Sequence, residues 1–195
     1  MKQVIAEAGK VKVVDVPVPK CNDGEVLVRA EYSLISTGTE TWTLDSTKPI
    51  GAGDLVGDSS RLKKAASLAS GVVKKEGFSG LVDYVKSVRN PEVALGYSVS
   101  GTVVKVGSRV TDVTAGVKVA CAGEGSACHA EYVAVPRNLL AKIPEGVSMK
   151  EAAFTTLGAI AIHGFRRSSA SLGESVAVLG VGLVGNLVVQ VCKKA

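Results

Sequence analysis

Residues 175–185 read SVAVLGVGLVG, an apolar run followed by a glycine-rich turn. A run without polar alternation is typical of a parallel strand that is buried on both faces. The turn has the pattern GxGxxG, and the apolar residues after it recur at helical spacing. We therefore predict a strand over Ser175–Leu179, then a turn, then a helix, which together form the opening βα unit of a nucleotide-binding α/β domain.

Each glycine of this turn has its own physical role. Gly180 permits the tight turn, Gly182 lets backbone approach a pyrophosphate, and Gly185 lets the helix pack on the strand. The first N–H groups of the helix attract the anion. The predicted cofactor-binding residues are Gly180, Gly182, Leu183, Val184 and Gly185. The alternative is a turn that binds no ligand, since a lone GxGxxG is weak evidence.

The acidic residue that binds the adenine ribose belongs about 20 residues after this turn. The sequence ends at Ala195, so it looks like a fragment that holds only the start of this domain. The choice between NAD and NADP therefore stays open. We expect the last ~25 residues to be the least stable part or an oligomerisation surface, with a homodimer as one outcome, because an incomplete sheet has unpaired edges.

The residues before this unit predict a mainly β domain. Apolar and polar residues alternate in short segments that turn residues separate, which is typical of a compact barrel. The predicted strands are Gln3–Ala6, Val11–Val16, Glu25–Ser33, Ser98–Val106, Val117–Cys121, Ala130–Pro136 and Leu140–Ile143.

Helical spacing appears in two places. Residues 59–90 contain two capped amphipathic stretches and predict an antiparallel helical hairpin. Ser148 and Glu151 form a capping box that opens a helix toward residues 158–161. We therefore expect a barrel domain over residues 1–147 with an insertion at 59–90, and a linker helix and truncated nucleotide-binding unit over residues 148–195.

Composition limits the classes of function. With 46% hydrophobic and 21% charged residues, the chain is typical of a soluble globular protein. It has no apolar run of the ~20 residues that a membrane span needs and no signal-peptide pattern, so we expect a cytoplasmic protein. The net charge of +5 comes from dispersed residues, which does not favour nucleic acid as a partner. The scattered cysteines Cys21, Cys121, Cys128 and Cys192 predict free thiols.

Three longer stretches carry a family resemblance. They are GYSVSGTVVKVGSRVTDVTAGVKVA (96–120), HAEYVAVPRNLLAKIPEGVSMKEAAF (129–154) and VAVLGVGLVG (176–185). Together they resemble the medium-chain dehydrogenase/reductase superfamily, in which a GroES-like domain precedes a Rossmann domain. The resemblance implies a mainly β GroES-like barrel with an inserted helical hairpin, followed by the first βα unit of a truncated α/β Rossmann domain, and it implies NAD or NADP as cofactor.

A narrower resemblance rests on ISTGTE (35–40), the helical insertion and LGY (95–97). These features are similar to the amino-terminal half of bi-domain bacterial oxidoreductases that carry a Gfo/Idh/MocA-like second half and occur with polysaccharide biosynthesis.

The resemblance also predicts that catalytic zinc is absent. Zinc-dependent members have Cys-Gly-Thr-Asp where this chain has Thr37–Glu40, and Gly-His-Glu where it has Gly96–Ser98. The third ligand position falls near Thr156. Hydroxyl groups do not replace thiolate, imidazole or carboxylate ligands of zinc. A metal site at Cys121, Cys128 and His129 is the alternative, which the lack of CxxC spacing disfavours.

Without zinc, hydrogen bonds must polarise a substrate carbonyl. The resemblance brings four hydroxyls to the cleft as candidate catalytic groups: Thr37, Thr39, Tyr97 and Thr156. As structural alternatives, the two former threonines would cap a turn and the tyrosine would plug the barrel. His163 is expected to be a packed helix residue rather than a base, and Ile160 stands where many members have a nicotinamide-contacting threonine.

Two functions remain. The first is the amino-terminal portion of a zinc-independent, NAD(P)-dependent oxidoreductase that acts on an alcohol or carbonyl compound, including a sugar derivative. Its partner is a small-molecule substrate, without nucleic acid or membrane, and the present residues alone are expected to be inactive. The alternative is a non-catalytic GroES-like interaction module whose nucleotide turn is vestigial.

Overall fold

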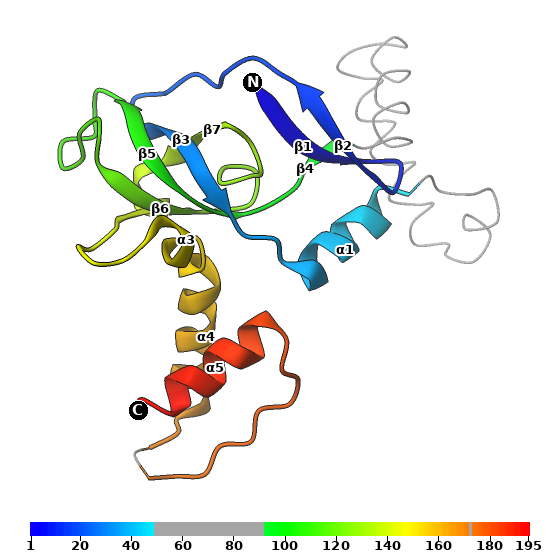
Figure 1. The fold of residues 1–195 in the computed structure, drawn as a ribbon, viewed down its shortest axis with the longest axis vertical. Helices are drawn as coiled ribbons and strands as arrows, with labels where there is room; N and C mark the ends of the chain where they lie inside the picture. Colours follow the sequence, from blue (N-terminus) through cyan, green and yellow to red (C-terminus); the bar gives the residue numbers. More distant parts are fainter. Residues whose placement is uncertain (49–91, 172) are drawn as a thin grey trace, which may run out of the picture. The chain divides into compact units, whose positions relative to one another are not determined.

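The computed structural model describes residues 1–48, 92–171 and 173–195 (Figure 1). The predicted hairpin at residues 59–90 lies outside the described residues. The chain divides into two compact units. The first unit is Met1–Gln3, Val14–Ser36 and Leu95–Ala195, and the second is Val4–Val13 and Thr37–Ala94. The predicted boundary at residue 147 stays a prediction.

The period-two pattern predicted the strands well. The described strands are β1 (Lys2–Glu7), β2 (Lys10–Asp15), β3 (Glu25–Ser33), β4 (Glu92–Ala94), β5 (Ser98–Val106), β6 (Lys118–Ala122), β7 (Tyr132–Pro136) and β8 (Leu140–Lys142). The helices are α1 (Thr37–Ser46), α3 (Met149–Ala152), α4 (Thr155–Ser168) and α5 (Leu183–Cys192), and η1 (Arg137–Leu139) is a 3-10 turn. The expected strands are confirmed within two residues at each end, and β4 was not predicted.

The first unit is built on an antiparallel sheet with the order β7-β3-β5-β6-β8 among the described residues. Val26 and Val28 of β3 pair with Val135 and Val133 of β7, and all four are almost fully buried. Two register shifts between β3 and β5 interrupt the ladder, and such irregularities bend a sheet. The unit is therefore a curled β structure with a valine-rich core.

Close backbone approach within this sheet requires glycine at position 101. A Cβ atom placed there would lie 2.2 Å from the carbonyl oxygen of Arg29 on the neighbouring strand. No side chain larger than hydrogen fits at that distance without moving the strand.

The described part of the second unit contains a helix that sequence patterning missed. Helix α1 holds four threonines within ten residues, and threonine is a weak helix former. Its Thr43 hydroxyl donates to the carbonyl oxygen of Thr39 over 3.0 Å, and Thr43 and Glu40 are its buried residues. With polar residues on the buried side, the helix has no apolar stripe for periodicity to detect.

The capping box at the start of the linker helix is confirmed. The Ser148 hydroxyl accepts from the Glu151 N–H, and the Glu151 carboxylate accepts from the Ser148 N–H. Two helices follow rather than one, because α3 ends at Ala152 and α4 begins at Thr155.

The predicted strand over Ser175–Leu179 is wrong. The segment has no strand conformation, most of it is exposed, and the Leu179 side chain is 100% exposed. A strand needs a hydrogen-bonded neighbour, and none of the sheets in the described part of the chain includes this segment. The helix that should follow the turn is present as α5.

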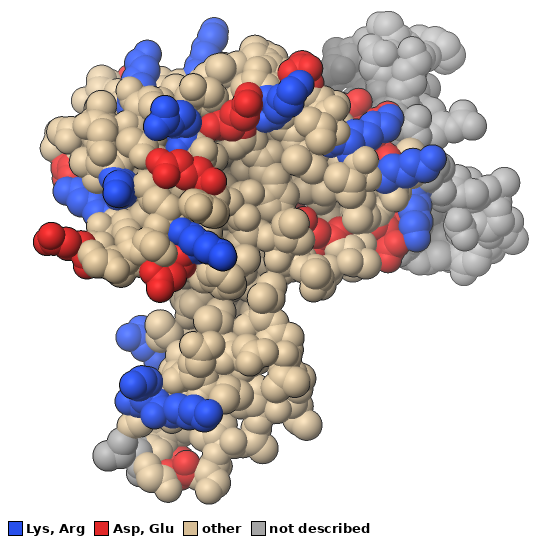
Figure 2. Space-filling model, in the orientation of Figure 1, with Lys and Arg blue, Asp and Glu red and all other residues tan. Residues whose placement is uncertain are grey.

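The surface charge and the apolarity of the helices bear on the expected partners. On the face drawn in Figure 2, acidic and basic side chains are interspersed over the β-strands rather than gathered into one basic patch. No helix in the described ranges is long and apolar enough to cross a membrane.

Candidate functional site

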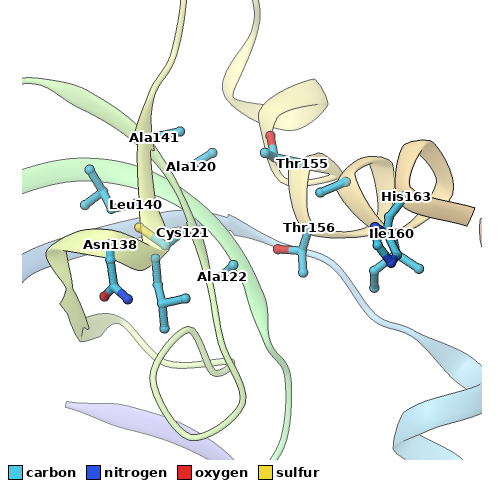
Figure 3. A pocket seen from close by; sticks show the side chains of 12 residues that line it. Ala120, Cys121, Ala122, Asn138, Leu140, Ala141, Thr155, Thr156, Ile160 and His163 are labelled. Carbon is cyan, nitrogen blue, oxygen red and sulfur yellow. The ribbon is translucent and has the colours of Figure 1, made fainter. Parts of the chain in front are cut away.

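A pocket of about 490 Å³ lies between helix α4 and the β6–β8 side of the large sheet (Figure 3). It belongs entirely to the first unit. Its lining residues are Ala120, Cys121, Ala122, Asn138, Leu139, Leu140, Ala141, Thr155, Thr156, Ala159, Ile160 and His163.

Helix α4 supplies one wall of the pocket. Thr156, Ile160 and His163 are spaced by four and three residues, so they lie on one helical face. Ile160 is 47% exposed, and His163 is also exposed. The expectation that His163 is a packed helix residue is therefore wrong for this structure, because its ring stands at the rim of the pocket.

The opposite wall is held in place by Arg137 of η1. Its Nη1 donates to the carbonyl oxygen of Leu140 over 2.8 Å, and its guanidinium forms an ion pair with Asp112. The hydrogen bonds that Arg137 Nε and Nη2 donate to the Asp112 carboxylate hold the pKa of Asp112 below its usual value. The contacts fix the turn that carries Asn138 and Leu139 into the pocket wall.

Thr156 is the predicted catalytic residue that the structure brings to this pocket. Its Oγ1 lies 2.7 Å from Oγ of Ser98, and the Ser98 oxygen lies 2.7 Å from the carbonyl oxygen of Ala153. Ser98 is 1% exposed. The Thr156 hydroxyl is thus tied to the sheet through a buried serine, a contact between residues 58 positions apart.

The other predicted hydroxyls lie elsewhere. Tyr97 is half-buried in the first unit and is absent from the pocket lining, and its carbonyl oxygen accepts from the Gly123 N–H over 3.0 Å. Thr37 and Thr39 are exposed residues in the first turn of α1, in the second unit. Catalytic roles for these three residues stay predictions.

The two thiols and the imidazole that suggested a metal site, those of Cys121, Cys128 and His129, are buried in the first unit. Burial raises the pKa of Cys121 to about 12 and also raises the pKa of Cys128, so both thiols are protonated at neutral pH. The His129 ring packs on Gly96, where a Cβ would come within 2.7 Å of Nδ1. Among the described residues, no three His, Cys, Asp or Glu side chains are grouped as metal ligands.

The glycine turn is tight at Gly180 and Gly185, although the predicted strand before it does not form. Gly180 has a φ of +90°, which favours glycine. A Cβ on Gly185 would lie 1.9 Å from the carbonyl oxygen of Gly180, whereas a Cβ on Gly182 would meet nothing within 4 Å. The turn is therefore tight on its inner side and open at Gly182, the N-cap of α5.

Sequence reasoning missed a residue that stabilises this turn. The Asn186 Nδ2 donates to the carbonyl oxygen of Val181 over 2.8 Å. An amide side chain placed directly after GVGLVG was the available signal, because asparagine often bonds to nearby backbone.

Comparisons with known proteins find similar chains among dehydrogenases and reductases. Residues 64–145 match the alcohol dehydrogenase GroES-like domain. Probable D-xylulose reductase A of Aspergillus clavatus is 33% identical over 133 residues, which cover 54% of this chain and 37% of that protein. The chloroplastic NADPH-dependent alkenal/one oxidoreductase of Arabidopsis thaliana is 40% identical over 108 residues, which cover 50% and 28%. Over about half of its length, the chain is thus similar to a reductase and an oxidoreductase.

A solved structure has the same fold. The quinone oxidoreductase of Coxiella burnetii superposes with a TM-score of 0.71 at 22% identity, over 100% of this chain and 53% of that one. The chain thus spans about half the length of that structure and 37% of the length of the reductase from Aspergillus clavatus.

Proposed function

We propose that the chain is the amino-terminal portion of a zinc-independent, NAD- or NADP-dependent oxidoreductase that acts on an alcohol or carbonyl compound. The observation that carries this proposal is the glycine turn, which has its tight side at Gly180 and Gly185 and its open side at Gly182. Open backbone at the start of a helix is what a pyrophosphate needs in order to approach.

The cofactor would be held by the turn and by the first N–H groups of α5, at Gly182, Leu183 and Val184. A bound nicotinamide supplies a hydride acceptor or donor. The chain's own part is to bind the anion, to orient the substrate in the pocket beside α4 and to keep water from its apolar walls. Ile160 gives that pocket an apolar side chain where many superfamily members have a threonine.

The donor groups at the zinc-ligand positions do not fit a catalytic zinc ion. Thr156 offers a hydroxyl that is bonded to Ser98, and no three His, Cys, Asp or Glu side chains in the described ranges are grouped as metal ligands. Zinc binds thiolate, neutral imidazole or carboxylate. Substrate polarisation therefore falls to hydrogen bonds, and the candidate donors are Thr37, Thr39 and Tyr97.

The test of this proposal is a titration of NADH and NADPH followed by amide chemical shifts. We expect shifts at residues 180–186 with affinity near the millimolar range, as contacts to the pyrophosphate alone would give. Gly182→Ala should weaken binding about tenfold or more, because its Cβ occupies the open space without straining the fold. Gly164→Ala, also in open space but within α4, is the control. Binding that Gly182→Ala leaves unchanged would contradict the proposal.

The non-catalytic interaction module remains the second candidate because large apolar side chains, among them Trp42 and Ile35, are exposed to solvent. Trp42 of α1 is 70% exposed and Ile35, in the other unit, is 62% exposed. A chain that shows no shift with either dinucleotide would favour this function. Sedimentation of the same sample tests the expected homodimer through residues Ser175–Leu179 and the apolar face that carries Leu187 and Val191.

A further inference from the structure

The two hydrogen bonds of Ser98 determine where the Thr156 proton lies. A carbonyl oxygen has no proton, so the 2.7 Å contact from Ser98 Oγ to the Ala153 oxygen must hold the Ser98 proton. A serine hydroxyl has one proton. The second 2.7 Å contact, to Thr156 Oγ1, must therefore hold the proton of Thr156. Thr156 donates to Ser98, and Ser98 donates to Ala153.

This arrangement leaves the Thr156 oxygen with lone pairs and no proton for a ligand. Its Oγ1 is drawn on the side that faces Ala122 and Cys121 across the pocket (Figure 3). A ligand beside it gains a hydrogen bond only by donating one. An alcohol O–H can donate to this oxygen, whereas a ketone or aldehyde oxygen would face it lone pair to lone pair.

Most of the other side chains that line the pocket are apolar. They include those of the alanines Ala122, Ala141 and Ala159 and of Leu139 and Ile160. The Thr155 hydroxyl bonds to the Ala152 carbonyl oxygen over 2.7 Å, and the other polar side chains are those of Asn138 and His163. These few groups offer a polyol fewer hydrogen bonds than water does, so the pocket favours an apolar ligand.

We infer that this pocket takes an apolar alcohol in preference to the matching carbonyl compound and to a polyol, and that Thr156, oriented by Ser98, sets the preference over the carbonyl compound. The inference rests on the proposed function for its place in a reaction. It narrows the substrate class from alcohols and carbonyls in general to an apolar alcohol, which an aryl alcohol represents in the test.

The test uses 1-phenylethanol, acetophenone and sorbitol as probes in methyl and amide shift titrations of the protein without cofactor. We expect shifts at Ala122, Ala141 and Ile160 with the two aromatic probes, and none there with sorbitol. The alcohol should bind about three- to tenfold more tightly than the ketone, the range for one net hydrogen bond.

Three variants separate the hydrogen-bond chain from a general packing effect. Ser98→Ala frees the Thr156 proton, so the alcohol preference should fall to about onefold or reverse. Thr156→Val removes the acceptor and should also abolish the preference, which keeps the test valid if Ser98→Ala destabilises the fold. Ser100→Ala is the matched control, since Ser100 is equally buried on β5 but bonds to Met149, and it should keep the wild-type preference.

Equal affinity for alcohol and ketone in the wild type, or the wild-type preference retained by Thr156→Val, would overturn the inference. So would the absence of pocket shifts with both aromatic probes, or tight sorbitol binding there. These outcomes need no cofactor, so they are distinct from a failure of dinucleotide binding at the glycine turn.

Discussion

Two valine-rich segments of this chain have opposite surroundings. In β3, Val26 and Val28 are fully buried between β5 and β7. In the segment 175–179, the same kind of apolar run is mostly exposed and has no strand conformation. The difference shows that an apolar β pattern is not sufficient for a strand. Neighbouring strands must also be present to bond to its backbone and to bury its side chains. The large sheet provides those neighbours for itself.

The largest effect on this comparison should come from adding one methyl group inside the sheet. Gly101→Ala places a Cβ 2.2 Å from the Arg29 carbonyl oxygen, so we expect a loss of about 3 kcal/mol or more in the free energy of unfolding. Gly158→Ala, in α4 with nothing within 4 Å of its Cβ, should be neutral or stabilise by up to about 1 kcal/mol. Urea denaturation of both variants measures this. Equal stability of the two would show that the sheet is not close-packed at Gly101.

The second prediction compares the reactivity of two thiols, Cys121 in the large sheet and Cys192 in helix α5. The pKa of Cys121 is raised to about 12 by burial, so almost none of it is thiolate at about pH 8. Cys192 of α5 is partly exposed. We expect iodoacetamide to modify Cys192 at least about a hundredfold faster than Cys121, as measured by mass spectrometry. Similar rates in the folded protein would contradict the burial of β6, and denatured protein gives the control in which both should react.

Core truncation gives the third contrast. Val28→Ala removes methyl groups from a fully buried site and should cost about 2 kcal/mol. Leu179→Ala removes a larger part of a side chain that is 100% exposed, and it should change stability by less than about 0.5 kcal/mol. Thermal unfolding of the two variants and the wild type measures both losses of stability. A larger loss for Leu179→Ala would mean that residues 175–179 are covered in solution.

Much of the first unit follows from sequence because its signals are local. Alternation gave the bounds of β3 and β5 correctly, and Ser148 with Glu151 marked the start of α3. The glycine turn is equally local, since φ at Gly180 and the close approach at Gly185 depend on neighbouring backbone.

The failures depend on distant contacts. The 175–179 prediction assumed neighbouring strands, and α1 buries polar residues that leave no apolar period. At the site, Thr156 was found by resemblance. Its bond to Ser98 joins residues 58 positions apart, and Asn138 and Leu139 reach the pocket through a turn held by Arg137. Spacing along the chain does not encode such contacts.

The smallest predicted effect concerns the capping box of Ser148 and Glu151 at the start of helix α3. Ser148→Ala removes the acceptor for the Glu151 N–H and should cost about 1 kcal/mol near neutral pH. Hydrogen bonds from Ser148 lower the pKa of Glu151. A carboxyl group whose pKa is lower in the folded state than in the unfolded state stabilises the fold at pH values above its unfolded pKa. That contribution to stability is lost as the pH falls through the folded-state pKa. The difference between wild type and variant should therefore shrink in acid, and a difference that grows in acid would refute the cap.

Amide hydrogen exchange tests most directly whether the sheet completes its own core while the segment before the glycine turn does not. We expect the amides of β3 and β5 to exchange only through global unfolding, and those of Ser175–Leu179 to exchange at least about a hundredfold faster. Equal protection of residues 175–179 and β5 would contradict this account, because it would show that the segment has found a partner strand.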